Sequence, residues 1–158
     1  SIPGLILLLA LTILIGSGYF QSMIALIIVW WPIYARLSRA QTLSIKGRYF
    51  IDSAKLSGLS DFQILIRHVL PNIIDPVLAY ATLDFGNVIL TYATLGFLGI
   101  GIKPPTPEWG EMVSAGLNEL PAYWWTAIFP GLVITIVALS FALVGDGLQD
   151  ILVGRVNY

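Results

Sequence analysis

Four long runs of apolar residues divide the chain, and polar segments separate them. The runs cover residues 2–16, 19–35, about 77–102 and about 123–144. A helix that crosses a membrane needs about 20 apolar residues, within a range of roughly 17 to 25. The last two runs meet this length and the second is at its lower limit, whereas the first would make a helix of only about 22 Å. Four such runs predict an all-α, polytopic bundle of transmembrane helices, although any one alone could be a buried helix of a soluble protein.

The segment between the second and third runs is polar, and its first half predicts one short helix. Apolar positions in residues 49–57 follow helical spacing, with Phe50, Ile51 and Ala54 on one side. Gly58 follows this stretch. Glycine ends a helix at low cost because it adopts the left-handed backbone conformation without a steric clash.

The second half of the same segment predicts another short helix. Ser60 and Gln63 form an S-x-x-Q capping box, which marks a helix start, and Pro71 is expected to stop the helix. Its apolar side would consist of Phe62, Leu65, Ile66 and Val69. Isolated helices this short are only marginally stable. The pair should therefore dock against another surface, unless it is an amphipathic segment lying on lipid.

The connection between the third and fourth runs, residues 103–122, also contains a helix signal. Thr106 is a suitable N-cap, Pro107 can occupy the first helical position, and Glu108 falls in the first turn. These residues predict a short helix; the alternative is a solvated connector.

Composition agrees with a membrane protein and excludes several chemistries. The chain has 57% hydrophobic and 11% charged residues, whereas soluble domains contain about 25% charged residues. The net charge of −1 gives no reason to expect a nucleic-acid partner, and the absence of cysteine excludes disulfides and thiolate chemistry. His68 is the only histidine, and no phosphate-binding P-loop motif occurs. We therefore expect no catalytic residue, no metal site and no bound cofactor, with any ATP held by another polypeptide.

The basic residues predict the orientation of the chain. Lys103 is the only base in the connection that follows the third run. The other seven of the eight Lys and Arg residues flank the runs on the opposite side: Arg36, Arg39, Lys46, Arg48, Lys55, Arg67 and Arg155. Cytoplasmic loops carry the excess of Lys and Arg. Residues 36–71 and the C-terminus are therefore expected in the cytoplasm, and residues 103–122 outside.

One face of the third run is polar. Tyr80, Asp84, Asn87, Thr91 and Thr94 recur at steps of three or four residues and so share a helix face. Asp84 would lie about 12 Å into the run, measured from Pro76. A carboxylate at that depth is costly and usually faces a protein interior or a water-filled path. The face could line a translocation path, or it could hydrogen-bond to a missing or partner span.

The polar insert resembles the EAA motif of ABC importer permeases: E-A-A, three residues, glycine, nine residues and I-x-L-P. It is present as Asp52-Ser53-Ala54, Gly58 and His68 to Pro71, and "RHVLPN" resembles the dipeptide, oligopeptide and nickel branch. Further stretches resemble the same family in order: WPIYARLSR (31–39), FLGIGIKPPTPEWGEM (97–112), FPG (129–131) and GDGLQD (145–150). Two departures are Tyr92, where the family usually has Glu, and LVGR (152–155) in place of LDPR.

The resemblance implies a single transmembrane permease domain over residues 1–158. It corresponds to the last four spans of a six-span permease, so that the chain would be a piece of a longer protein. Residues 46–71 would form the cytoplasmic coupling loop, with 52–71 docking on an ATPase, and residues 103–122 the external loop. The coupling residues would be Asp52, Ser53, Ala54, Ser57, Gly58, Leu70 and Pro71. Candidate path residues are Tyr80, Asp84, Asn87, Thr91 and Tyr92.

The partners implied by the resemblance are a second permease, two ATPase subunits or domains that hold ATP, and an external substrate-binding protein, all at the cell inner membrane. A peptide-like substrate is expected, with nickel or oligosaccharide as the alternative in the same family. A membrane-embedded enzyme would need a nucleophile and a base at membrane depth, and a passive channel would not need a docking insert. Both are therefore weaker explanations of the sequence.

Overall fold

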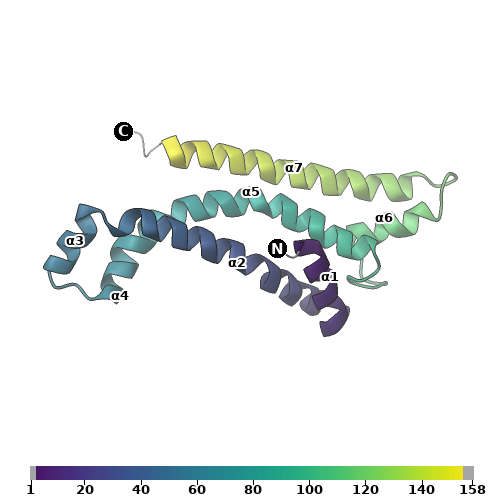
Figure 1. Cartoon of the computed structure of the whole chain (residues 1–158). Coiled ribbons are helices and arrows are strands. Elements are labelled where there is room, and N and C mark those ends of the chain that lie inside the picture. The colour runs from purple at the N-terminus through teal and green to yellow at the C-terminus, as the bar shows by residue number, and fades with distance from the viewer. Residues whose placement is uncertain (1–2, 155–158) are drawn as a thin grey trace.

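The computed structural model describes residues 3–154, so Ser1, Ile2 and Arg155 lie outside the described residues. Within this part every regular element is helical. The elements are α1 (Gly4–Ile15), α2 (Tyr19–Lys46), α3 (Tyr49–Leu56), α4 (Asp61–Ile64), the π-helical segment η1 (Leu65–Val69), α5 (Leu70–Phe97), α6 (Trp109–Leu117) and α7 (Trp125–Gly154). Helices α2, α5 and α7 lie lengthwise beside one another, with α3 and α4 at one end and α6 at the other (Figure 1).

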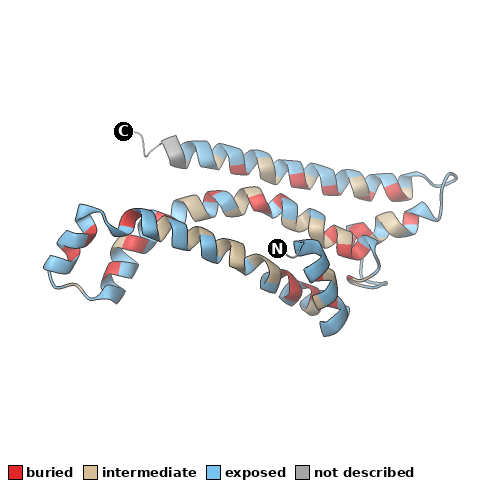
Figure 2. Ribbon diagram, in the orientation of Figure 1, coloured by how far each residue is buried: buried red, intermediate tan, exposed pale blue. Residues whose placement is uncertain are grey.

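Three of the helices in the described part are long and apolar enough to cross a membrane: Tyr19–Lys46, Asp61–Phe97 and Trp125–Ile151. The expected fourth span is only the 12-residue α1, about 18 Å long. It ends at Ile15, because the φ of 107° at Gly16 breaks the helix at the end of the apolar run. Much of the helical surface is exposed and apolar (Figure 2), as expected for helices that face lipid.

Close contact between α5 and α7 depends on glycine. A Cβ on Gly86 would lie 2.9 Å from the carbonyl oxygen of Ala138, and a Cβ on Gly145 would lie 2.7 Å from the backbone nitrogen of Leu83. Both distances are too short for a real side chain. Lipid supplies no hydrophobic force between helices, so small residues that let backbones approach are a principal source of association in membranes.

Pro71 does not stop the second short helix, contrary to the prediction. Helix α4, η1 and α5 form one continuous 37-residue helix from Asp61 to Phe97. Proline removes an N–H donor and its ring clashes with the carbonyl four residues back. The wider π-helical turn over Leu65–Val69 lies immediately before Pro71 and accommodates both effects.

The predicted apolar side of this helix is right for Val69, which is buried, and wrong for Phe62, Leu65 and Ile66, which are exposed. The other buried residue is Ile64, five positions before Val69. Five residues is the spacing of a π-helical turn, so the turn over Leu65–Val69 places Ile64 and Val69 on one side where α-helical spacing would not.

The short helix predicted within residues 103–122 exists, but it starts later than predicted. Helix α6 covers Trp109–Leu117, and its N-cap is Glu108 rather than Thr106. Glu108 is buried, and its Oε2 accepts a hydrogen bond of 2.7 Å from the backbone N–H of Glu111. Its carboxylate packs on Gly96, where any Cβ would collide with Oε2. This tertiary contact selects Glu108 as the cap.

Candidate functional site

Helices α3 and α4 form a hairpin that folds back on the ends of α2 and α5. Six buried residues from these elements make a separate hydrophobic cluster: Ile45, Ile51, Ala54, Ile64, Val69 and Ile73, with Leu59 packed against it. Ile51, at the centre of α3, is 2% exposed. The short helix α3 is therefore held by its own chain, which supplies the stability that it lacks in isolation. Helix α4 is the start of the continuous helix that ends at Phe97.

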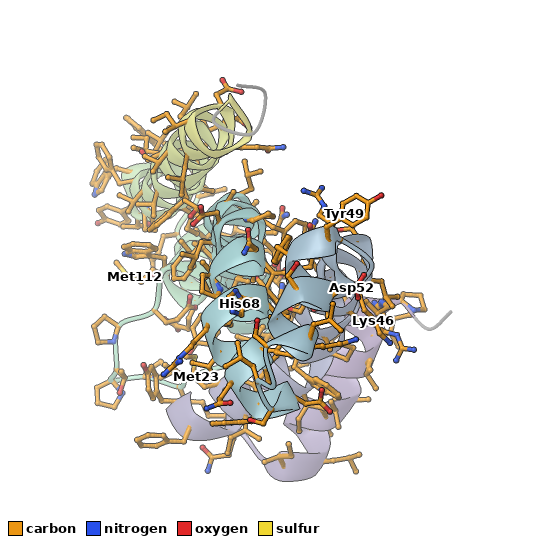
Figure 3. All side chains as sticks on the ribbon, turned by 90° about the vertical axis from the view of Figure 1, so that its left-hand side faces the viewer. Met23, Lys46, Tyr49, Asp52, His68 and Met112 are labelled. Atoms are coloured by element: carbon orange, nitrogen blue, oxygen red, sulfur yellow. The ribbon has the colours of Figure 1, made fainter. Side chains whose placement is uncertain are left out.

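The opposite side of α3 is open. Tyr49 and Leu56 are each 90% exposed, and Asp52, Ser53 and Lys55 are exposed as well. Figure 3 looks onto this end of the molecule and labels Tyr49 and Asp52 on α3. The outer side of α3 therefore exposes two large apolar side chains beside its polar and charged ones.

The turn between the two helices has a defined geometry. Gly58 has φ +79°, in the left-handed region, and its N–H donates to the carbonyl of Lys55 at 2.9 Å. The capping box is present: the backbone N–H of Ser60 donates to Oε1 of Gln63 at 2.9 Å, and the N–H of Gln63 donates to the hydroxyl oxygen of Ser60 at 3.4 Å. These bonds fix the turn that connects α3 to α4.

The predicted coupling residues occupy different environments. Asp52, Ser53, Ser57 and Gly58 are exposed on α3 and its turn, and the Ser57 hydroxyl donates to the carbonyl of Ser53 at 2.9 Å. Ala54 lies in the buried cluster, so it holds α3 in place and is not available to a partner. The remaining two, Leu70 and Pro71, are exposed on the first turn of α5.

Asp84 lies near the middle of α5 and is only 6% exposed. Its Oδ2 accepts hydrogen bonds from Nε1 of Trp30 at 2.8 Å and from the hydroxyl of Tyr34 at 3.1 Å, and its Oδ1 accepts one from Nδ2 of Asn87 at 3.4 Å. Trp30 and Tyr34 are one turn apart on α2. The carboxylate therefore joins α5 to α2. This is a helix-packing contact, but its partner is a span of this chain and not the missing or partner span that the sequence-based alternative named.

The rest of the polar face of α5 does not form one continuous group. Tyr80 packs edge-to-face on Tyr34, with ring centroids 5.8 Å apart. The Thr91 hydroxyl donates to its own helix, to the carbonyl of Asn87 at 2.7 Å. Tyr92 lies apart from them, and its buried hydroxyl oxygen has no hydrogen-bond partner among residues 3–154. It lines a cavity of about 520 Å³ that also contains Glu108, at the end of the molecule where α6 begins.

The sequence did not predict Trp30 and Tyr34 as the hydrogen-bond partners of Asp84. Their i, i+4 spacing on α2 places both donors on one face, and this spacing was the only available signal. The spacing does not show which acceptor the two donors bind, because Asp84 lies 54 residues after Trp30 and 50 residues after Tyr34. Among the residues that the structure describes, no group of three His, Cys, Asp or Glu side chains could hold a metal ion.

The comparisons with known proteins agree with one another. Residues 1–158 match the family described as "Binding-protein-dependent transport system inner membrane component". The probable D,D-dipeptide transport system permease protein DdpC of Escherichia coli K12 is 41% identical over 152 residues, covering 96% of this chain and 51% of that protein. The dipeptide transport system permease protein DppC of Alkalihalophilus pseudofirmus is 40% identical, covering 96% and 50%. The glutathione transport system permease protein GsiD of E. coli O1:K1 is 41% identical, covering 96% and 50%. The chain thus spans about half the length of the curated relatives it matches.

Proposed function

Since the chain belongs to the family of inner-membrane components of binding-protein-dependent transport systems, we propose that it is part of the permease subunit of an ATP-driven importer for peptide-like substrates. The relatives named above are permeases for dipeptides and glutathione, which supports a small peptide as the substrate. Nickel and oligosaccharide are the alternative substrates. Either would change the transported molecule and leave the rest of the proposal as it stands.

The observation that carries the proposal is the folded hairpin with its open outer face. A channel that works without an energy source has no use for a preformed docking element at the end of its spans. We infer that Asp52, Ser53, Ser57 and Gly58 form the surface that an ATPase contacts, with Leu70 and Pro71 at its edge. Ala54 supports that surface from below, because it lies in the cluster beneath α3.

The partners follow from this assignment. ATP would be bound by two ATPase subunits or domains, a second permease would complete the translocation path, and an external binding protein would deliver the substrate. We propose that five residues of α5 face this path or hold its walls together: Tyr80, Asp84, Asn87, Thr91 and Tyr92. We place residues 36–71 and the C-terminus in the cytoplasm, because the bases gather at that end of the spans.

Uptake by the reconstituted complex tests the function. The chain should be purified with its partner subunits, placed in lipid vesicles and supplied with the binding protein and a labelled dipeptide. We expect accumulation that requires hydrolysable ATP. Equal uptake with a non-hydrolysable analogue would contradict ATP-driven import and support a passive channel. ATP-dependent uptake of a nickel complex or an oligosaccharide in place of the peptide would contradict the substrate class alone.

A further inference from the structure

The π-helical turn over Leu65–Val69 is the junction between the hairpin and the spanning helix α5. Ile64 and Val69 are both buried in the cluster beneath α3, together with Ile73. Five α-helical residues turn by about 140° beyond a full circle, so Ile64 would leave this cluster if the turn were α-helical. The register seen in the structure therefore depends on the extra residue of the π-helical turn.

The same segment contains a second apolar face, which belongs to an α-helical register. Counting back from Ile73 and Val69 in α-helical steps of three or four residues gives Ile66, Leu65 and Phe62. In the structure these three residues, called the outer apolar face, are exposed, and Phe62 is 71% exposed. Removal of the extra residue of the π-helical turn would rotate them toward the cluster and Ile64 away from it. The sequence thus supplies an apolar face for each register.

Lipid does not account for the outer apolar face. The apolar run of α5 begins at about Val77, and Phe62 and Ile66 precede it by about 22 Å and about 16 Å of helix. The polar layer of a bilayer leaflet is only roughly 5 to 8 Å thick, so both residues lie beyond it. Burial of the outer apolar face in the α-helical register would remove it from water and offset the loss of Ile64 from the cluster.

Pro71 favours the π-helical register. It has no N–H to donate to the carbonyl four residues back, and its ring clashes with that carbonyl in an α-helix. Asn72 donates from Nδ2 to the carbonyl oxygen of His68 at 2.7 Å and so satisfies one carbonyl of the turn. Phe50 of α3 lies beside the ring of His68, with the ring centroids 6.5 Å apart. Helix α3 is therefore joined to the turn itself.

We propose that the segment from Asp61 to Val69 has two packing registers and that the π-helical turn is the switch between them. In the register seen here Ile64 lies in the cluster, and in the other the outer apolar face replaces it. The change rotates α4 by about 100° relative to α5 and moves α3 with it. Packed elements are bistable rather than continuously deformable, so the hairpin occupies one register or the other. Selection of the register by an ATPase on α3 rests on the proposed function, whereas the two registers do not.

Thiol labelling of the full chain, purified with its partners, tests the switch. The chain has no cysteine, so Ile64→Cys and Ile66→Cys each introduce a single reactive site. Each variant is protected only in the register that buries its position. The reaction is quantified on this chain by mass spectrometry, so that cysteines of the partners do not interfere. With Pro71 in place we expect Ile66→Cys to react fast and Ile64→Cys to react slowly.

Pro71→Ala should move the segment toward the α-helical register, because it restores the N–H and removes the clash. We expect the ratio of the Ile66→Cys rate to the Ile64→Cys rate to fall by about tenfold or more. Pro76→Ala is the matched control, since Pro76 lies inside α5 but outside the π-helical turn, and it should leave the ratio unchanged. A non-hydrolysable ATP analogue, added to the assembled complex with Pro71 in place, should lower the ratio as Pro71→Ala does.

Three outcomes would overturn the two registers. An unchanged ratio in assembled Pro71→Ala would show that the turn is fixed; if this variant does not assemble, an unchanged ratio with the ATP analogue has the same meaning. An equal rise in both rates would mean that the hairpin opens locally. Slow reaction of Ile66→Cys that becomes fast when the ATPase is removed would assign the outer apolar face to the partner. A ratio that responds to Pro71→Ala and not to the analogue would support the two registers and contradict only their use by an ATPase.

Discussion

Replacing Gly58 by valine is expected to remove most ATP-driven import while leaving the complex assembled. Gly58 has φ +79°, and a Cβ built there meets no atom of the described residues within 4 Å, so the expected effect comes from the backbone conformation. The left-handed conformation costs a residue with a Cβ about 1–2 kcal/mol, and a β-branched side chain is the least suited to it. Strain of this size lowers the population of the observed turn by a factor of roughly 5 to 30. Import and ATP hydrolysis, each per assembled complex, are the quantities to measure.

Two other glycines provide matched controls for Gly58→Val. Gly47 lies just before the hairpin with an ordinary φ of −95°, and Gly99 has φ +72° at the other end of the molecule. Within the part of the chain that the structure describes, a Cβ added to either would meet no atom within 4 Å. Gly47→Val should preserve import because it adds a side chain without strain. Gly99→Val adds the same strain away from the hairpin and should keep hydrolysis coupled to import. Normal import by Gly58→Val would show that the turn does not set the position of α3.

Asp84→Leu is expected to lower the yield of assembled complex strongly. It removes the acceptor of Trp30 and Tyr34 and leaves both donors unpaired between α2 and α5. An unsatisfied buried donor costs about 1–3 kcal/mol. Asp84→Asn keeps one carbonyl oxygen at the same position and should be mild in both assembly and import. The measurements are the yield of intact complex in detergent and import per complex.

The Asp84 comparison separates the two roles of the carboxylate. If Asp84 acts through its charge on a translocated cation, Asp84→Asn would assemble normally and change the import rate or the substrate preference. That result would contradict the packing role favoured by the hydrogen bonds. Normal import by Asp84→Asn together with poor assembly of Asp84→Leu would confirm the packing role.

Local chemistry predicted the hairpin well, because each of its signals acts over a few residues. Gly58 ends α3 in the left-handed conformation, and Ser60 and Gln63 make both bonds of the capping box. The continuation of the helix through Pro71 could not be predicted, because a prediction from α-helical spacing assumes that no π-helical turn interrupts the helix. Leu65 and Ile66, which lie in that turn, were consequently assigned to the wrong face.

The spacing of residues along the sequence could not predict the tertiary contacts of the site. The polar face of α5 was visible as a repeat, but the donors that satisfy Asp84 lie on α2, more than 40 residues away. The start of α6 depends on the contact between Glu108 and Gly96, which no local signal reveals.

The central claim is that the open face of the hairpin docks on an ATPase, and one crosslinking measurement tests it most directly. The chain has no cysteine, so Ser57→Cys introduces a single reactive site at the exposed end of α3, and Asn118→Cys places an exposed control at the opposite end of the molecule. A short bifunctional thiol-to-amine reagent is applied to both variants in the assembled complex. We predict that the Ser57→Cys variant crosslinks to the ATPase and that the Asn118→Cys variant does not. Reaction of the Ser57→Cys variant only with lipid-soluble probes, with no product that contains the ATPase, would contradict the account.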